Sequence, residues 1–306
     1  MTTSVGPRSG RSSSSGPLCS TWTREHGVDP IGTAGCYRGY LLVEWPLPWP
    51  RDMSEDPELA PLVEAARLAG MRFQGLVPAS VDGATRVVCY RWPPNGPAFE
   101  RAELAVDKSE VIAAGLAVLD EPPSKDGIVE VLVCTHGRRD RCCGSLGTAL
   151  ASEITADPLG DEGVKIWRTS HTGGHRFAPT AVVLPQGTAW AFCDRDILSR
   201  IVRHDGSVGE VLARYRGCAG MGSPVIQALE RAVLGEVGWP LFDMVRHGED
   251  LGDARVELVV GEPGGARSVW EAFVRAETVP MPDCGMPVEL ATKTERQFVV
   301  EGLRRR

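Results

Sequence analysis

Cysteine and histidine side chains concentrate in two short segments of this sequence. The segment CTHGRRDRCCG begins at Cys134, and the segment HTGGHRFAPT begins at His171. Eight residues separate Cys134 from Cys143, and three residues separate His171 from His175. Thiolates together with imidazoles suit zinc or an iron–sulfur cluster with mixed ligands. These four side chains are therefore candidate metal ligands.

Each segment directly follows a predicted strand. Residues 127–134 (GIVEVLVC) form an apolar, β-branched run that is typical of a buried strand in a parallel sheet. Residues 164–170 indicate a second strand, and a helix over residues 145–156 would join the two as a β-α-β unit. The carboxyl ends of such strands lie side by side, where α/β folds bind ligands. We therefore expect the fold to bring the four side chains together, in loops whose glycines let the backbone approach a cluster closely.

The order of the predicted elements indicates the fold class. Residues 128–222 read β-α-β-β-β-α, because the β-α-β unit is followed by a hairpin over 181–192 and a helix over 197–203. This is the order of a thioredoxin-like α/β fold. Residues 18–120 read in the same order at an offset of roughly 85 to 95 residues. A second thioredoxin-like half could therefore precede the cluster domain.

The other segments predict connecting or peripheral structure. Residues 1–17 are poor in apolar side chains and predict a disordered tail. Residues 121–127 (EPPSKDG) predict a linker between the two domains, and residues 223–306 predict a small α+β C-terminal extension. Two pairs of residues predict helix starts, Asp56-Pro57 and Ser223-Pro224.

Composition and charge exclude several classes of function. The net charge of −7 over 306 residues argues against a general nucleic-acid binder. No apolar run reaches the roughly 20 residues of a transmembrane helix, and the N-terminus lacks the apolar segment of a secretory signal. The nine cysteines lack the dense, even spacing of a secreted disulfide scaffold. We therefore expect a cytoplasmic protein without nucleic-acid or membrane partners.

The motifs of this chain resemble the sucrase/ferredoxin-like family, which is related to the thioredoxin-like [2Fe–2S] ferredoxins. The matching motifs are CTHGRRD (134–140), CG (143–144), HTGGH (171–175), LPQG (184–187), YRG (215–217) and GTAG…YLLVEWPLPW (32–49). The resemblance implies that Cys134 and Cys143 hold one iron of a [2Fe–2S] cluster and that His171 and His175 hold the other. It implies a one-electron carrier, rather than a stand-alone enzyme, that works with a redox partner protein, either a reductase or an electron acceptor.

Such a ligand set has consequences for the redox chemistry. Two imidazoles in place of two thiolates would raise the reduction potential, as in Rieske centres. The outer N–H of each imidazole would allow proton uptake to accompany reduction. Asp140 is expected to pair with a neighbouring arginine. The arginines of the two segments would stabilise the reduced state, and they are Arg138, Arg139, Arg141 and Arg176.

Neighbouring residues leave one ambiguity about the ligands. Cys142 directly precedes Cys143, and either thiol could reach an iron. The family pattern places the ligand just before the glycine, which favours Cys143. His136 is interpreted as a loop histidine that hydrogen-bonds to the backbone. The remaining cysteines show no partner pattern, and we expect most of them to be buried apolar residues: Cys19, Cys36, Cys89, Cys193, Cys218 and Cys284.

Three other classes of function compete with an electron carrier. A zinc-binding structural or regulatory domain could use the same two cysteines and two histidines, because they also satisfy tetrahedral zinc. A thiol oxidoreductase could use Cys142 and Cys143, although the chain has no Cys-x-x-Cys motif and vicinal disulfides are strained. A hydrolase would need a pair of carboxylates placed for glycoside cleavage, and the sequence offers no such pair.

Overall fold

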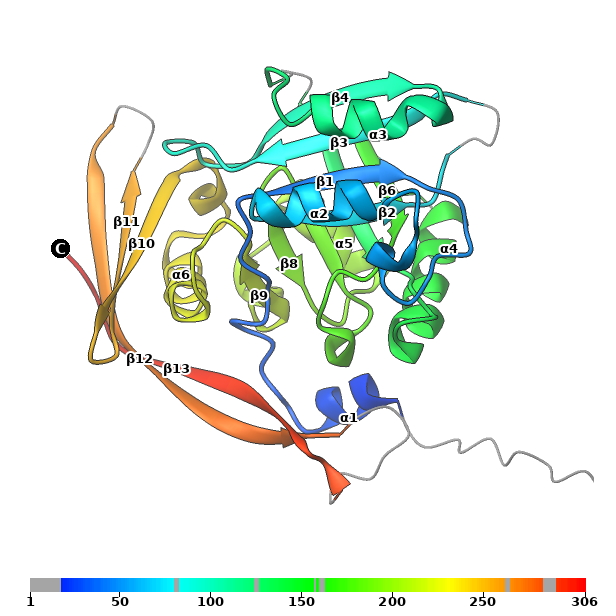
Figure 1. Cartoon of the computed structure of the whole chain (residues 1–306). Coiled ribbons are helices and arrows are strands. Elements are labelled where there is room, and N and C mark those ends of the chain that lie inside the picture. Colours follow the sequence, from blue (N-terminus) through cyan, green and yellow to red (C-terminus); the bar gives the residue numbers. More distant parts are fainter. Residues whose placement is uncertain are drawn as a thin grey trace, which may run out of the picture.

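A computed structural model describes residues 18–79, 83–123, 127–156, 158–159, 163–261, 265–282 and 290–306. The predicted tail (residues 1–17), residues 124–126 of the predicted linker, and Cys284 lie outside the described residues. The chain is mixed α/β, with nine strands in one mixed sheet and four strands in a small antiparallel sheet (Figure 1). Within the described ranges, no helix combines the length and the apolar character needed to span a bilayer.

The first four strands occupy one end of the large sheet, and we call them the first quartet. They are β1 (Gly39–Glu44), β2 (Met71–Leu76), β3 (Thr85–Arg91) and β4 (Glu100–Val106). Their spatial order is β4-β3-β1-β2, with β1 parallel to β2 and β3 antiparallel to its neighbours. Helix α2 (Ala60–Leu68) connects β1 to β2, and α3 (Val111–Ala117) follows β4.

The next four strands form a second quartet with the same internal arrangement. They are β5 (Val129–Cys134), β6 (Val164–Thr169), β7 (Ala181–Leu184) and β8 (Thr188–Trp190). Their order is β6-β5-β7-β8, with β5 parallel to β6 and β7 antiparallel to its neighbours, and β9 (Tyr215–Cys218) pairs with β8. Helix α4 (Thr148–Ala156) connects β5 to β6, and α5 (Arg195–Arg203) follows β8.

The two quartets join edge to edge through β2 and β6. These strands run antiparallel and pair at Leu76 and Thr169, the last residue of each. Just beyond β6, the N–H of Ser170 donates to the carbonyl of Gly75 at 2.8 Å. Because only the carboxyl ends of the two strands overlap, the loop that follows β6 lies against β2 of the first quartet.

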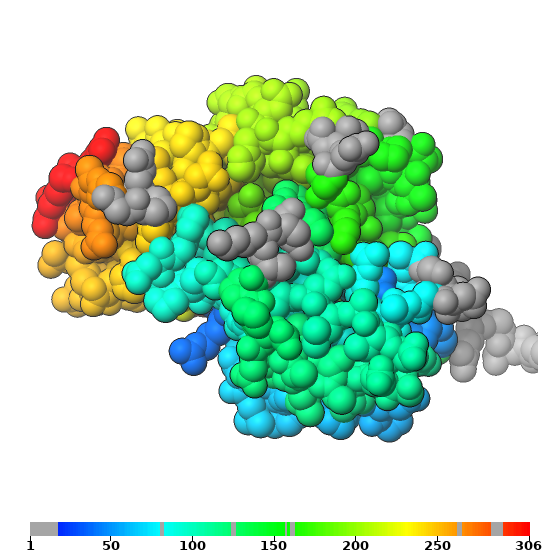
Figure 2. Space-filling model, turned by 90° about the horizontal axis from the view of Figure 1, so that it is seen from above, coloured from blue at the N-terminus to red at the C-terminus, as the bar shows by residue number. Residues whose placement is uncertain are grey.

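The last part of the chain builds the small sheet. Its strands are β10 (Val245–Gly252), β11 (Arg255–Gly261), β12 (Arg267–Met281) and β13 (Lys293–Arg305), all antiparallel in sequence order. Helix α6 (Pro224–Val237) contacts β9 of the large sheet and also β11, β12 and β13 of the small one. Seen from above, the orange and red residues of the small sheet lie at one end of the molecule (Figure 2).

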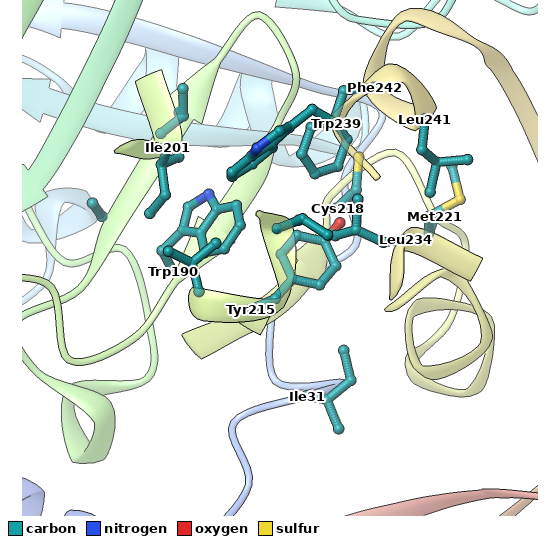
Figure 3. Packing of buried hydrophobic residues seen from close by; sticks show 14 of the residues in the cluster. Ile31, Trp190, Ile201, Tyr215, Cys218, Met221, Leu234, Trp239, Leu241 and Phe242 are labelled. Atoms are coloured by element: carbon teal, nitrogen blue, oxygen red, sulfur yellow. The ribbon is translucent and has the colours of Figure 1, made fainter. Parts of the chain in front are cut away.

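The core beside β8 and β9 is rich in aromatic side chains. The ring centroids of Trp190 and Tyr215 lie 5.0 Å apart, and Trp239 lies 6.5 Å from Trp190 (Figure 3). Trp190 and Tyr215 are fully buried. Cys19, Cys89, Cys193 and Cys218 are buried and Cys36 is exposed, which confirms the prediction that most of these cysteines are buried.

Local sequence explains most element boundaries. Helix α6 begins at Pro224, and the hydroxyl of Ser223 accepts the N–H of Ile226, as the Ser-Pro pair predicts. The predicted start at Asp56-Pro57 is wrong by a few residues, because α2 begins at Ala60. The Asp56 carboxylate instead accepts N–H groups within a turn that precedes the helix. The sequence reading also missed β9, β10 and the short helix α1 (Cys19–Glu25).

Candidate metal centre

Three of the four predicted ligands converge at the carboxyl ends of β5 and β6. Cys134 is the last residue of β5, Cys143 is the first residue of a π-helical turn, η3 (Cys143–Gly147), and His171 follows β6. One possible ligand atom from each of the three residues lies within 4.8 Å of the other two. Both cysteines are fully buried, and the His171 side chain is 15% exposed. The parallel pairing of β5 and β6 produces this juxtaposition, as such strand ends meet at one edge.

His175 lies beside this group but outside it. It is the first residue of the 3-10 turn η4 (His175–Phe177), and its ring centroid is 6.5 Å from that of His171. Between the two histidines, Gly173 and Gly174 have φ angles of +90° and +72°. Glycine adopts these values without the strain that a side chain would add. The HTGGH loop therefore turns sharply and keeps both imidazoles near the end of β6.

Asp140 lies between the two histidines. Its Oδ2 is 2.9 Å from Nδ1 of His171, and its Oδ1 is 3.2 Å from Nδ1 of His175. The prediction that Asp140 pairs with an arginine is therefore wrong, because its carboxylate lies against the two imidazoles instead. Burial would raise the pKa of Asp140, but the two histidines and Arg139 lower it below its usual range. The carboxylate is thus a fixed negative neighbour of both rings.

The two imidazoles have different surroundings. Burial alone would lower the pKa of His171, but Asp140 and Cys134 raise it. Burial lowers the pKa of His175. Nδ1 of His171 is buried and, despite its short distance to Asp140, has no hydrogen bond of acceptable geometry. Because Nδ1 lies 2.9 Å from a carboxylate oxygen of Asp140, the opposite ring nitrogen, Nε2, is the one that could bind a metal.

The thiols of Cys134 and Cys143 shift each other's pKa in opposite directions. The hydrogen bond from Cys143 lowers the pKa of Cys134 well below its usual range, against the effect of burial, and His171 adds to the lowering. The same hydrogen bond and burial raise the pKa of Cys143. The thiolate is the form of cysteine that binds metals, so one of the two is already favoured as a ligand.

Glycines allow the close approach of the two cysteine-bearing segments. A Cβ on Gly147 would fall 1.9 Å from the carbonyl oxygen of Cys134, and a Cβ on Gly144 would fall 2.3 Å from the Cα of Gly137. Neither space admits a side chain. The turn that carries Cys143 can therefore lie against the end of β5 only because these positions are glycine.

Cys142 points to a different partner. Its Sγ lies 3.4 Å from Sγ of Cys19 in α1, and both residues are buried. The convergent group contains Cys143 and not Cys142, which agrees with the family pattern. His136 behaves as interpreted from the sequence: its Nε2 lies 2.8 Å from the carbonyl of Pro50, and its Nδ1 accepts the N–H of His171.

The first quartet supports the ligand loop directly. Gln74 in β2 is 1% exposed, and its Nε2 donates to the carbonyl of His171 at 3.1 Å. Its Oε1 accepts the hydroxyls of Thr169 and Ser170, each at 3.1 Å. Arg72 in β2 also donates to the carbonyl of His171. Sequence reasoning missed these residues, since nothing in the local pattern of β2 signals a partner nearly a hundred positions away.

Three of the four predicted arginines contact residues outside the group of candidate ligands. Arg139 forms an ion pair with Asp52 at 2.8 Å, and Arg138 donates to the carbonyl of Trp49. Arg176 lies 3.8 Å from Glu295. Besides Arg72, a second guanidinium lies against the HTGGH loop: Arg216 belongs to the YRG motif in β9 and donates to the carbonyl of Gly173 at 3.2 Å. The YRG motif was the available signal, but it indicated family membership and not a role.

A cavity of about 610 Å³ opens beside His171. Its wall includes His171 and His136 from the second quartet's loops and residues from β2 and the segment after β1. Four arginines line it, Arg51, Arg67, Arg72 and Arg139, together with the carboxylates of Asp52 and Glu64. Glu64 pairs with Arg67, and Asp52 pairs with Arg139. The lining therefore has an excess of positive charge next to one candidate ligand.

The donor set and its surroundings fit a metal or an iron–sulfur cluster. Two buried thiols and a partly buried imidazole suit zinc or iron, and a second imidazole lies beside them. No disulfide joins cysteines within the ranges that the structure describes. The thiols of Cys134 and Cys143 are therefore available as ligands.

Comparison with known proteins shows which family the chain belongs to. A curated relative, "Altered inheritance of mitochondria protein 32" of Meyerozyma guilliermondii, is 30% identical over 110 residues. The match covers 34% of this chain and 38% of that relative, so it spans well under half of either protein. No solved structure matches the chain significantly. The sucrase/ferredoxin-like family model matches residues 30–217, which contain both quartets and every candidate ligand, and the chain belongs to that family.

Proposed function

We propose that this chain is a one-electron carrier with a [2Fe–2S] cluster held by Cys134, Cys143, His171 and His175. The observation that carries the proposal is the convergence of the first three side chains within 4.8 Å at two parallel strand ends. When bound, such a cluster takes up and releases one electron at a time. The two thiolates would bind one iron and the two imidazoles the other.

The protein's own residues hold this site ready. The N–H of His171 is fixed by His136, and its carbonyl is held by Gln74 and Arg72. Asp140 contacts both rings through Nδ1, in the manner of the carboxylate–histidine pairs that orient metal ligands. Because Asp140 faces both imidazoles, it is also placed to accept or stabilise a ring proton when the charge of the site changes.

The strand order supports a thioredoxin-like fold for each quartet. In both, a parallel β-α-β unit is followed by an antiparallel hairpin, and the third strand lies next to the first. We therefore propose that residues 18–120 and 128–222 are two thioredoxin-like domains and that residues 223–306 are a C-terminal extension. The second of these domains would carry the cluster.

We propose that the redox partner, a reductase or an electron acceptor, exchanges electrons at the His171 side of the site. His171 forms part of the wall of the cavity described above, whereas the two cysteines are fully buried. The excess of arginines in that wall favours a partner with an acidic surface. The cysteines of the described residues form no disulfide, which suits a reducing compartment such as the cytoplasm. The name of the Meyerozyma guilliermondii relative refers to mitochondria.

Zinc is the second candidate. The same group of two thiols and one imidazole would satisfy three positions of a tetrahedral zinc site, and His175 stands next to it. A zinc domain would have a structural or regulatory role and no visible absorption.

The deciding experiment is metal analysis of anaerobically purified protein. We expect a brown protein with two irons and two acid-labile sulfides per chain, whose visible absorption bleaches on reduction. A colourless protein with one equivalent of zinc and no sulfide would overturn the proposal in favour of the zinc domain. Iron without sulfide would also contradict it.

A further inference from the structure

A buried guanidinium lies beside the candidate metal centre. Arg216 in β9 is 1% exposed. Its Nε donates to the hydroxyl of Thr33 at 3.0 Å, its Nη2 to the carbonyl of Thr33 at 2.6 Å, and its Nη1 to the carbonyl of Gly173 at 3.2 Å. All of these acceptors are neutral. The positive charge of Arg216 is therefore hydrogen-bonded but not neutralised.

The other two buried arginines behave differently. Arg101 contacts the carboxylates of Glu103 and Glu130, and Arg246 pairs with Glu230 at 2.9 Å. Among the residues that the structure describes, no carboxylate forms an ion pair with Arg216. A buried charge without a counter-charge is strongly unfavourable. The site of Arg216 thus lacks the compensation that this protein supplies to its other buried guanidinium groups.

Burial cannot remove this charge. It lowers the pKa of Arg216, but an arginine side chain stays protonated inside proteins. The Cys143 thiol acts in the opposite direction, because a negative charge there raises the pKa of Arg216. Among the groups that raise the pKa of Arg216, this candidate ligand has the largest effect.

The HTGGH loop is shaped around this guanidinium. A Cβ on Gly174 would fall 2.2 Å from Nη2 of Arg216, and Gly174 has a φ of +72°. The carbonyl that Arg216 contacts belongs to Gly173, which lies between His171 and His175 in the sequence. The positive charge is consequently fixed against the backbone that carries both candidate imidazole ligands.

We propose that Arg216 is the fixed counter-charge for the electron that this site takes up, and that it raises the reduction potential. The inference rests on the proposed function. Two ferric ions, two sulfides and two thiolates are neutral together, so one added electron leaves a single negative charge. The electron comes from the redox partner, and no bond is made or broken. A fixed guanidinium in a water-poor site stabilises that negative charge without reorganisation. A zinc site would gain no charge, and the uncompensated guanidinium would have no such role.

The test compares charge-removing and charge-keeping variants by the visible spectrum and the midpoint potential. Arg216→Gln should shift the one-electron equilibrium about tenfold toward the oxidised state, about 59 mV. Arg216→Lys keeps the charge and should stay closer to the unmodified protein. Arg138→Gln is the matched control, since it removes the same charge from an exposed guanidinium in the cysteine loop, and it should change the potential less.

A second pair of variants tests the charge while keeping Arg216 in place, in case Arg216→Gln loses the cluster. Thr33→Asp puts a carboxylate next to the guanidinium and should lower the potential, whereas the neutral Thr33→Asn should not. Unchanged potentials in Arg216→Gln and Thr33→Asp, with the visible spectrum intact, would overturn the role of Arg216 and leave the cluster assignment standing. A colourless zinc protein would overturn the proposed function itself, and this inference with it.

Discussion

The two quartets share one strand arrangement, yet only the second carries candidate ligands. In the second quartet, β5 ends at Cys134 and the turn after it begins with Cys143. In the first quartet, the corresponding segment after β1 carries Trp45 and Trp49, which are buried and joined by a hydrogen bond from Trp49 Nε1 to Trp45 O. The same topology therefore places buried tryptophans after the first strand of one quartet and candidate metal ligands after the first strand of the other. The residues at the strand ends decide the chemistry.

The first quartet still takes part in the site, through its backbone and one edge strand. Because β2 and β6 overlap only at their carboxyl ends, Gln74 and Arg72 reach the carbonyl of His171. One half thus supplies the ligands and the other half fixes the loop that holds them. An isolated second quartet would lose these hydrogen bonds.

The largest expected effect concerns the cysteines, which only the second quartet carries as candidate ligands. Cys134→Ser or Cys143→Ser should abolish or strongly deplete the visible absorption and the bound metal, because each removes a convergent thiol. Cys142→Ser is the matched control and should keep most of both, since its thiol lies next to Cys19. Iron, sulfide and zinc analysis of the three purified variants checks this. Loss in Cys142→Ser with retention in Cys143→Ser would move the ligand by one residue.

The second prediction concerns the helix that follows the first strand of the second quartet. Gly147→Ala should lower the free energy of unfolding by about 2–3 kcal/mol, because its Cβ would collide with the carbonyl of Cys134. Gly115→Ala in α3 of the first quartet is the comparison, and its Cβ would meet the movable end of the Leu62 side chain. We expect a smaller loss there, partly offset by the higher helix propensity of alanine. Denaturant unfolding measures both, and equal losses would contradict the difference.

A third prediction tests the support that the first quartet gives. Gln74→Leu should lower the free energy of unfolding by about 1–2 kcal/mol, since the His171 carbonyl and the hydroxyls of Thr169 and Ser170 lose a buried partner. Gln74→Glu keeps the acceptor for the two hydroxyls and serves as the comparison. Denaturant unfolding and retention of the metal check the effect. If Gln74→Leu is as stable as the parent, the hydrogen bonds of Gln74 do not contribute to the free energy of unfolding, and the prediction is wrong.

The fourth prediction concerns protons at the imidazoles. Oxidised iron withdraws electron density from a bound imidazole and makes its outer N–H more acidic than in the reduced state. The midpoint potential should therefore fall as the pH rises through the range where the oxidised form loses that proton, by about 59 mV per pH unit for one proton per electron. Asp140→Asn removes a negative neighbour that favours the protonated ring, so this range should move to lower pH. Voltammetry over neutral to alkaline pH measures both, and a flat potential would exclude titrating imidazole ligands.

Local sequence determined many of the secondary-structure elements of this protein and its candidate ligands. The β-branched run that ends at Cys134, the hairpin after it and the Ser223-Pro224 helix start all follow from patterns within a few residues. The candidate ligands could be named for the same reason, because cysteine and histidine at two strand ends need only the β-α-β order to meet. The succession of strands and helices along each quartet also followed from these patterns.

Only the tertiary structure decided what surrounds those ligands. Asp140 faces two histidines, and Arg216 meets Thr33 across 183 positions of sequence. The edge pairing of β2 with β6, and the strand β9 that carries Arg216, likewise depend on which surfaces meet when the chain folds. A charged or polar side chain has no periodic pattern that reveals its partner. Its partner is set by packing between distant segments, which is why these contacts could not be predicted from sequence.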